Sequence, residues 1–142
     1  MVIAMLVPTV TGVIYYSKPL LGKPWMKSIG MTEEKQKEGN MAMMMGVSIV
    51  LSFFVAFFML FFCNQPGQEG EFDTFKHGAF HGAFIAIVFA MPIYIINGLF
   101  EQKKWSNMLI NALYWIITLA IMGGILDVMN HFPNTMQEYM GN

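Results

Sequence analysis

The sequence predicts an all-α fold: an integral membrane four-helix transmembrane bundle in one domain, residues 1–142, with both termini outside. Hydrophobic residues make up 56% of the 142-residue chain and charged residues 12%, about half the charged share of a typical soluble protein. The apolar residues gather into four uncharged stretches, and about 20 such residues in a helix cross the hydrocarbon layer of a bilayer. Membrane lipids are therefore the expected surroundings of the chain.

The four predicted spans cover about residues 1–18, 41–63, 77–100 and 105–127. The last three are long enough to cross a bilayer as helices. The first is short, and Lys18 is expected to extend it by reaching the headgroups. A signal peptide is the rival interpretation of this first stretch. It lacks a basic start and a small-residue cleavage site, which favours a retained anchor helix.

Prolines and a capping residue predict where the helices break and begin. Pro19 and Pro24 are expected to interrupt helix in the first connection. Thr32 can cap a helix whose first turn carries two glutamates. The second long helix is therefore expected to begin near Thr32, in water, and to enter the membrane around Met41. Pro92 is expected to kink the third span, because its ring displaces a backbone hydrogen bond.

Lysine placement predicts the orientation, because cytoplasmic loops carry an excess of positive charge. All eight basic residues are lysines, and seven of them lie in the first and third connections. Only Lys76 lies in the second. Both lysine-rich connections are therefore expected in the cytoplasm, in a multi-pass protein of the cell inner membrane. The net charge is −1, and no basic patch is present to hold a phosphate backbone, so no nucleic-acid partner is expected.

Three segments resemble a known family: IYYSKPLLGKPWM after the first span, NGLFEQKKW before the fourth, and NALYWIITLAIMGGIL within it. They are similar to small four-span bacterial membrane proteins described as a domain of unknown function, number 1761. The resemblance covers nearly the whole chain and is most specific at Tyr16, Ser17, Lys23, Trp25 and residues 100–114. It implies four helices and a membrane location. It implies no activity, so no catalytic residue and no enzyme is predicted.

The outer ends of the spans hold a candidate metal site. His77 and His81 are four residues apart, so they share one face of a helix, at a spacing at which two imidazoles reach one ion. Further candidate ligands are expected at the same membrane level: Cys63, Asp73, Asp127 and His131. No cofactor is predicted outright, and a metal- or haem-binding protein is one alternative function. Histidines near a helix end also cap helices, bond across them or face water.

Small residues predict a close helix contact. Gly78 and Gly82 form a GxxxG pattern, which lets two helices approach closely. Gly123 and Gly124 in the fourth span offer a matching surface. The contact is expected either within the chain or in a homodimer, and the motif alone does not decide between them.

Polar side chains gather toward the inner ends of the spans. A polar group in hydrocarbon must find a partner or cost free energy. The set is therefore predicted either to fix the register of the helices or to line a small cavity for a polar ligand. Its members are Tyr15, Tyr16, Ser48, Ser52, Tyr94, Asn97, Asn107, Asn111, Tyr114 and Thr118.

These patterns favour a non-enzymatic membrane module. It would be a scaffold subunit of a larger membrane complex, or would hold a small ligand in the inner cavity. The alternatives are the metal- or haem-binding protein and a small transporter with a kinked third span. No charged residue lies in the middle of any span. That argues against a proton-coupled exporter, because an intramembrane charge usually marks a proton or ion path.

Overall fold

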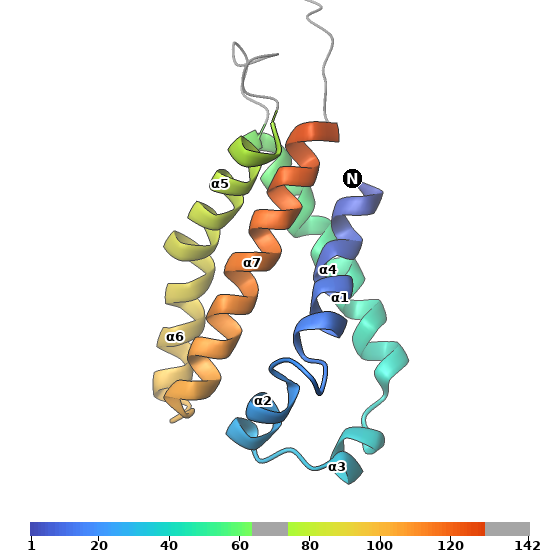
Figure 1. Cartoon of the computed structure of the whole chain (residues 1–142), viewed down its shortest axis with the longest axis vertical. Helices are drawn as coiled ribbons and strands as arrows, with labels where there is room; N and C mark the ends of the chain where they lie inside the picture. The colour runs from blue at the N-terminus through green and yellow to red at the C-terminus, as the bar shows by residue number, and fades with distance from the viewer. Residues whose placement is uncertain (64–73, 130–142) are drawn as a thin grey trace, which may run out of the picture.

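A computed structural model describes residues 1–63 and 74–129 (Figure 1). This part of the chain is helical, without a strand, which confirms the predicted all-α class. The elements in order are α1 Val2–Tyr15, α2 Gly22–Ile29, α3 Glu33–Glu38, α4 Met41–Cys63, α5 Phe75–Ile85, the π-helical turn η1 Ala86–Ala90, α6 Met91–Phe100 and α7 Trp105–Met129.

Three helices of the described part are long and apolar enough to cross a membrane: Met41–Phe62, Phe75–Phe100 and Trp105–Met129. Large apolar side chains cover their outer surfaces, as at Phe54 and Phe84, and such a surface suits lipid rather than water. The helix α1 is also apolar but has 14 residues, a rise of about 21 Å. A membrane protein is therefore supported, while the fourth crossing stays a prediction.

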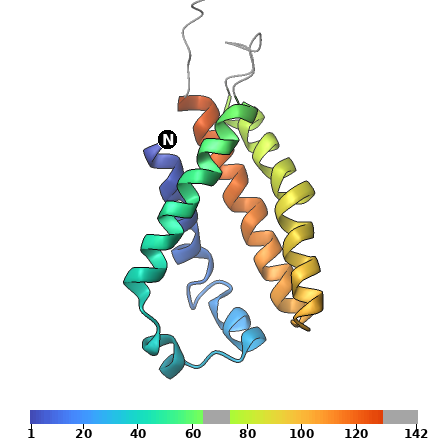
Figure 2. The ribbon, with the colours of Figure 1, turned by 180° about the vertical axis from the view of Figure 1, so that it is seen from behind.

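The long helix α7 is the centre of the molecule. It packs against α5, η1 and α6 on one side and against α1 and α4 on the other (Figures 1 and 2). The N-terminus, the start of α5 and the end of α7 lie at one end, here called the histidine end (Figure 1). The short helices α2 and α3 lie at the opposite end, here called the α2–α3 end. The lysine-rich first connection lies at the α2–α3 end.

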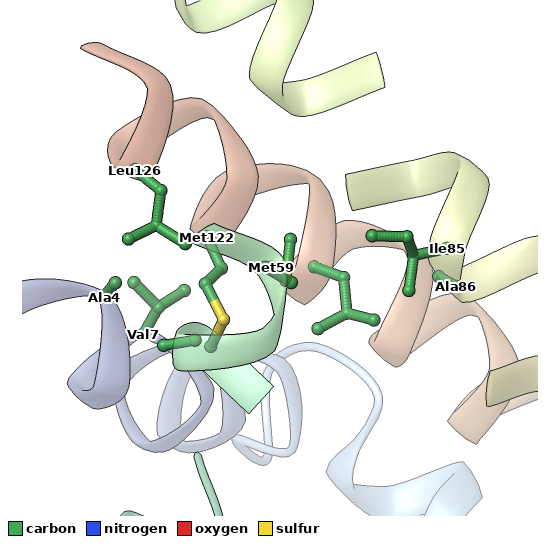
Figure 3. Close-up of a cluster of buried hydrophobic side chains, with 9 residues drawn as sticks. Ala4, Val7, Met59, Ile85, Ala86, Met122 and Leu126 are labelled. Atoms are coloured by element: carbon green, nitrogen blue, oxygen red, sulfur yellow. The ribbon is translucent and has the colours of Figure 1, made fainter. Parts of the chain in front are cut away.

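The core is made of small and flexible side chains contributed by all the long helices. Figure 3 shows Met59 of α4 and Met122 of α7 between Ala4 and Val7 of α1 and Ile85 near η1. Both methionines are fully buried. In lipid the outer surface is as apolar as the core, so helix association depends on close packing rather than on the hydrophobic effect.

Glycines bring α5 and α7 into backbone contact. A Cβ atom on Gly82 would overlap the carbonyl group of Leu119, and one on Gly78 would overlap the carbonyl of Gly123. Gly124 lies against the ring of Phe75 in the same way. The GxxxG surface is therefore used inside the chain, as one of the two predicted alternatives. A homodimer, if it forms, must use another surface.

The predicted start of the second long helix at Thr32 is wrong. The Thr32 hydroxyl does cap a helix, accepting a hydrogen bond from the Lys35 N–H at 3.3 Å, but this helix is the six-residue α3. Gly39 then adopts an extended conformation, with ψ at 138°. The Asn40 side chain accepts a bond from the Met43 N–H at 3.0 Å and starts α4 afresh. Because Asn40 is a second capping residue, α3 and α4 are two helices and not the single helix that the sequence predicted.

The first connection is also more helical than its prolines predicted. Pro24 lies in the first turn of α2, where a backbone N–H has no partner within the helix and its loss costs little. The helix ends at Gly30, whose φ of 66° is left-handed and suits glycine.

The irregularity expected at Pro92 takes the form of the π-helical turn η1. The Met91 N–H bonds to the Ala86 carbonyl, five residues back instead of four. The wider turn makes room for the proline ring and keeps the backbone of this long helix bonded, which the bilayer requires.

Candidate functional site

Two groups of polar side chains lie at opposite ends of the molecule. The histidine cluster, defined as His77, His81 and Asp127, lies at the histidine end. The inner polar network, defined as Tyr16, Ser28, Tyr94, Asn107 and Asn111, lies at the α2–α3 end beside a cavity.

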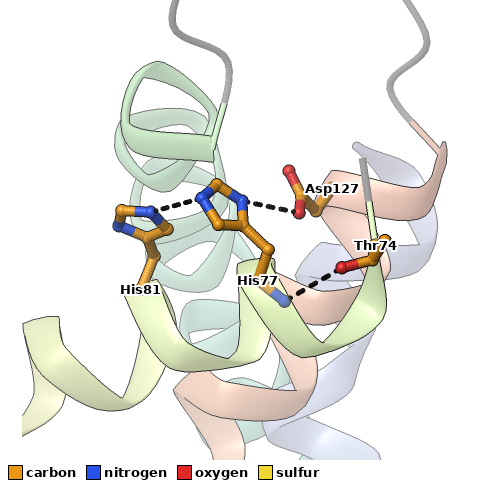
Figure 4. A network of polar contacts seen from close by, with 4 residues as sticks. All are labelled: Thr74, His77, His81 and Asp127. Carbon is orange, nitrogen blue, oxygen red and sulfur yellow. Dashed lines mark hydrogen bonds and ion pairs between the residues drawn. The ribbon is translucent and has the colours of Figure 1, made fainter. Parts of the chain in front are cut away.

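The histidine cluster begins with the cap of α5 (Figure 4). The Thr74 hydroxyl accepts a hydrogen bond from the His77 N–H at 3.3 Å and fixes the first turn. One turn later, His81 Nε2 lies 3.1 Å from His77 Nε2. On its other side, His77 Nδ1 lies 3.1 Å from Asp127 Oδ2 of α7. The three side chains thus form a row, with His77 in the middle.

The carboxyl group of Asp127 is buried, and burial of a carboxylate is unfavourable. Its side chain is 1% exposed, and its second oxygen, Oδ1, has no hydrogen-bond partner within residues 1–63 and 74–129. The close contact of α5 and α7 at Gly78 brings the Asp127 Cβ beneath the cap of α5. A buried carboxylate needs a hydrogen-bond donor or a cation, and Nδ1 of His77 lies within hydrogen-bond distance of it.

The predicted metal ligands converge only in part. His77 and His81 face each other through Nε2, but Asp127 approaches the opposite nitrogen of His77, so it does not point at the space between the two rings. The described residues contain no group of three or more His, Cys, Asp or Glu side chains that could hold one ion. His131 and Asp73 lie outside the described residues, as does the side chain of Cys63.

The inner polar network joins four segments of the chain. The Tyr16 hydroxyl donates to Asn111 Oδ1 at 2.6 Å, and Asn111 Nδ2 donates to the Asn107 carbonyl at 2.8 Å. The Tyr94 hydroxyl donates to Asn107 Oδ1 at 3.0 Å, and Asn107 Nδ2 donates to Ser28 Oγ at 3.2 Å. Asn107 is 2% exposed. The network therefore fixes the end of α1, the helix α2 and the helix α6 against α7.

Charged groups at the rim of this network lie outside the membrane-crossing helices. Lys103 Nζ lies 5.4 Å from the centre of the Tyr94 ring and pairs with the Glu101 carboxylate. The hydrogen bond that Lys103 donates to the Glu101 carboxylate raises the pKa of Lys103 above its ordinary value. Lys103 therefore stays positively charged beside the end of α6, where the helix dipole also favours a cation.

Aromatic rings support the same end of the molecule. The ring of Tyr16 lies 5.1 Å from the rings of Tyr15, Trp25 and Tyr114, measured between centroids. These rings meet edge-on or tilted, which is the favourable arrangement for aromatic pairs. Tyr15 also donates from its hydroxyl to the Ile110 carbonyl at 2.9 Å.

A cavity of about 680 Å³ lies between α1, α4 and α7. The side chains of Trp25, Met26 and Gln36, from α2 and α3, line it at the α2–α3 end. Its volume is in the range of small-molecule sites. Most of its lining is apolar, and none of the lining side chains is charged. The polar side chains among them are Thr9, Tyr16, Gln36, Ser48, Ser52, Asn111 and Tyr114.

One polar atom beside the cavity is buried without a partner. Thr9 Oγ1 makes no hydrogen bond to any part of the chain that the structure describes. The neighbouring polar groups of α1 are all engaged: Thr11 bonds to Thr118 at 2.9 Å, and the Pro8 carbonyl accepts from Tyr114 at 2.6 Å. An unpaired hydroxyl in an apolar wall costs free energy unless a ligand bonds to it.

The ten residues predicted for the inner cavity divide into two groups. Five line the cavity: Tyr16, Ser48, Ser52, Asn111 and Tyr114. The others do not line it. Tyr94 and Asn107 bond to each other, Tyr15 to a backbone carbonyl and Thr118 to Thr11. Asn97 is exposed on α6.

The sequence patterns missed Thr9, Thr11 and Ser28. Thr9 and Thr11 are hydroxyl-bearing residues in an otherwise apolar helix, and the rule that intramembrane polar groups need partners could have marked them. Ser28 donates to the Trp25 carbonyl at 2.6 Å. No pattern in the sequence joins it to Asn107, 79 residues away.

Comparison with known proteins places the chain in one family. Residues 1–127 match the family model described as "Protein of unknown function (DUF1761)". The match includes the histidine cluster, the inner polar network and every residue that lines the cavity. Neither the curated proteins nor the solved structures gave a match. Because the matched region covers most of its length, this chain belongs to the family of proteins of unknown function DUF1761.

Proposed function

We propose that the protein is a non-enzymatic inner-membrane protein that binds a small, uncharged amphiphile in the cavity between α1, α4 and α7. In this proposal all four apolar helices cross the membrane and both termini face outward. The observation that carries the proposal is the buried, unpartnered hydroxyl of Thr9, a residue that lines a cavity of about 680 Å³.

The chemistry of the wall defines the ligand class. Apolar side chains such as Leu51 and Val55 suit a hydrocarbon body. The absence of charge among the lining side chains suits an uncharged head, such as a hydroxyl or carbonyl group, that bonds to Thr9. A charged head would be left unpaired in a medium of low polarity, which is costly.

The inner polar network supports binding by holding the wall still. Tyr16 and Asn111 belong both to the network and to the lining of the cavity. Their mutual bond is made before a ligand arrives, so binding orders few side chains. Such preorganisation favours affinity because less conformational entropy is lost on association.

The cavity can be probed with 12-bromododecanol, an amphiphile whose bromine quenches tryptophan fluorescence on contact. Trp25 and Trp115 line the cavity, whereas Trp105 is 60% exposed. The background protein therefore carries Trp105→Phe and is studied in lipid nanodiscs. We expect quenching that saturates with a defined dissociation constant, because a fixed number of sites is filled.

A matched pair of variants on α4 gives the control. Ser52→Phe places a ring in the cavity and should weaken binding at least tenfold, about 1.4 kcal/mol. Val50→Phe adds a ring on the same helix at a side chain that is 58% exposed and outside the cavity lining, so its binding should equal the background. Equal quenching in the two variants, or quenching that only rises linearly as the probe partitions into lipid, would contradict the proposal. Thermal unfolding confirms that both variants fold.

A further inference from the structure

We propose that His77 and His81 form a binding site for a divalent transition-metal ion such as Zn²⁺, Cu²⁺, Ni²⁺ or Co²⁺. The ion would be held by Nε2 of both imidazoles, with Asp127 as the positioning residue behind His77. This site is independent of the amphiphile cavity, because none of His77, His81 and Asp127 lines that cavity. The three residues lie together where α5 begins and α7 ends (Figure 4).

The first argument is distance. Imidazole nitrogens lie about 2.0–2.1 Å from zinc, so two of them in a tetrahedral shell lie about 3.3 Å apart. The Nε2 atoms of His77 and His81 are 3.1 Å apart and face each other. The two ligands therefore need to separate by only a few tenths of an ångström to admit an ion. Four-residue spacing on α5 supplies this arrangement, and the Thr74 cap fixes the turn that carries it.

The second argument is the direction of the ring nitrogens. The contact with Asp127 is made through Nδ1 of His77, so Nε2 is the nitrogen of His77 that lies toward His81. An ion between the two rings would take the lone pair of each Nε2, and the proton of each neutral imidazole would then stand on Nδ1, where His77 can donate it to Asp127.

The third argument is charge. Asp127 is 1% exposed, and its Oδ1 is unpaired among the described residues. A carboxylate buried to this extent is unfavourable unless a hydrogen-bond donor or a cation lies near it. A divalent cation bound one imidazole away from Asp127 offsets this cost. A carboxylate behind a metal-binding histidine also fixes the tautomer and strengthens the ligand, as in many metal sites.

The geometry favours a small ion over haem. A haem with two axial histidines needs them on opposite faces of a flat macrocycle, and two residues one turn apart on one helix cannot supply this. With two protein ligands, the remaining positions of the ion would be filled by water. Such a site is open, and thus suited to exchange an ion or to take a further ligand.

The test uses the full chain, purified in detergent without any histidine-rich tag and stripped with a chelator. Co²⁺ is titrated and followed by its visible absorption bands, and Zn²⁺ competition gives the affinity for zinc. We expect one ion per chain. His81→Gln, which keeps a polar side chain but removes the imidazole, should weaken binding at least 100-fold. His77→Gln should act in the same way, so the result does not depend on one variant folding.

Asp127→Asn separates the positioning role from mere binding. The asparagine amide can still accept from His77 Nδ1–H but carries no charge, so affinity should fall about 10- to 100-fold while the cobalt spectrum keeps two nitrogen ligands. Lys76→Ala, next to His77 on an exposed side chain, serves as the control and should bind like the native chain. No bound ion, or equal binding by the native chain and both glutamine variants, would overturn the site. Unchanged affinity in Asp127→Asn would overturn the role given to Asp127.

Discussion

Replacing Gly82 by alanine is expected to lower the free energy of unfolding by about 3 kcal/mol, the upper range for overpacking. The added methyl group would meet the carbonyl group of Leu119, which is backbone and cannot rotate away. The α5–α7 contact would have to open along its length, because Gly78 meets Gly123 one turn earlier. Unfolding by SDS titration, followed by far-ultraviolet circular dichroism, measures the loss.

Gly46→Ala is the matched control for this prediction. Gly46 is also a glycine inside a membrane-crossing helix, but a Cβ atom built on it has no described atom within 4 Å. The substitution should therefore leave stability unchanged or raise it slightly, since alanine is the better helix former. Equal effects at the two positions would show that α5 and α7 are not in backbone contact.

Tyr16→Ala is expected to lower the free energy of unfolding by about 2 kcal/mol, less than the ~3 kcal/mol lost when an aromatic side chain of the core is removed, because the Tyr16 side chain is only partly buried. The ring of Tyr16 packs against Trp25 and Tyr114, and its hydroxyl makes the 2.6 Å bond to Asn111. Without it, the end of α1 loses its attachment to the inner polar network. The same SDS titration measures the effect.

Two further variants separate the ring from the hydroxyl. Tyr16→Phe keeps the ring contacts and should cost only about 1 kcal/mol, the usual net value of one hydrogen bond. Phe100→Ala removes a ring that is 87% exposed and should have little effect. If Tyr16→Phe proved as harmful as Tyr16→Ala, the hydroxyl bond rather than ring packing would hold this end of α1.

The sequence predicted the long apolar helices and the close helix contact, because both depend on residues that are near one another in the chain. The three long apolar runs correspond to α4, to α5 through α6, and to α7, because crossing a bilayer requires length and hydropathy that a sequence displays directly. The GxxxG pattern at Gly78 and Gly82 also predicted a close contact, because small residues four apart on one helix let a second helix approach closely. It could not name α7 as the partner, since that choice depends on how all the helices pack.

The features that were missed depend on competition or on long-range contact. Thr32 and Asn40 both cap helices, and a pattern that recognises one cap does not show that a second one follows. Asp127 approaches Nδ1 rather than Nε2 of His77. This depends on the axial position of α7 relative to α5, which cannot be read from the sequence. The Thr9 hydroxyl is unpaired because the packing of the helices brings no described donor or acceptor within hydrogen-bond distance of it, and this packing is likewise not visible in the sequence.

The most direct test of the account measures stability and ligand affinity together in Thr9→Val. Valine has nearly the shape of threonine without the hydroxyl, so it removes a buried group that has no described partner. Ligand-free Thr9→Val should be more stable by about 1 kcal/mol, and should bind 12-bromododecanol about tenfold more weakly than the native chain. Lower stability with unchanged affinity would show that the Thr9 hydroxyl serves the fold and not a ligand.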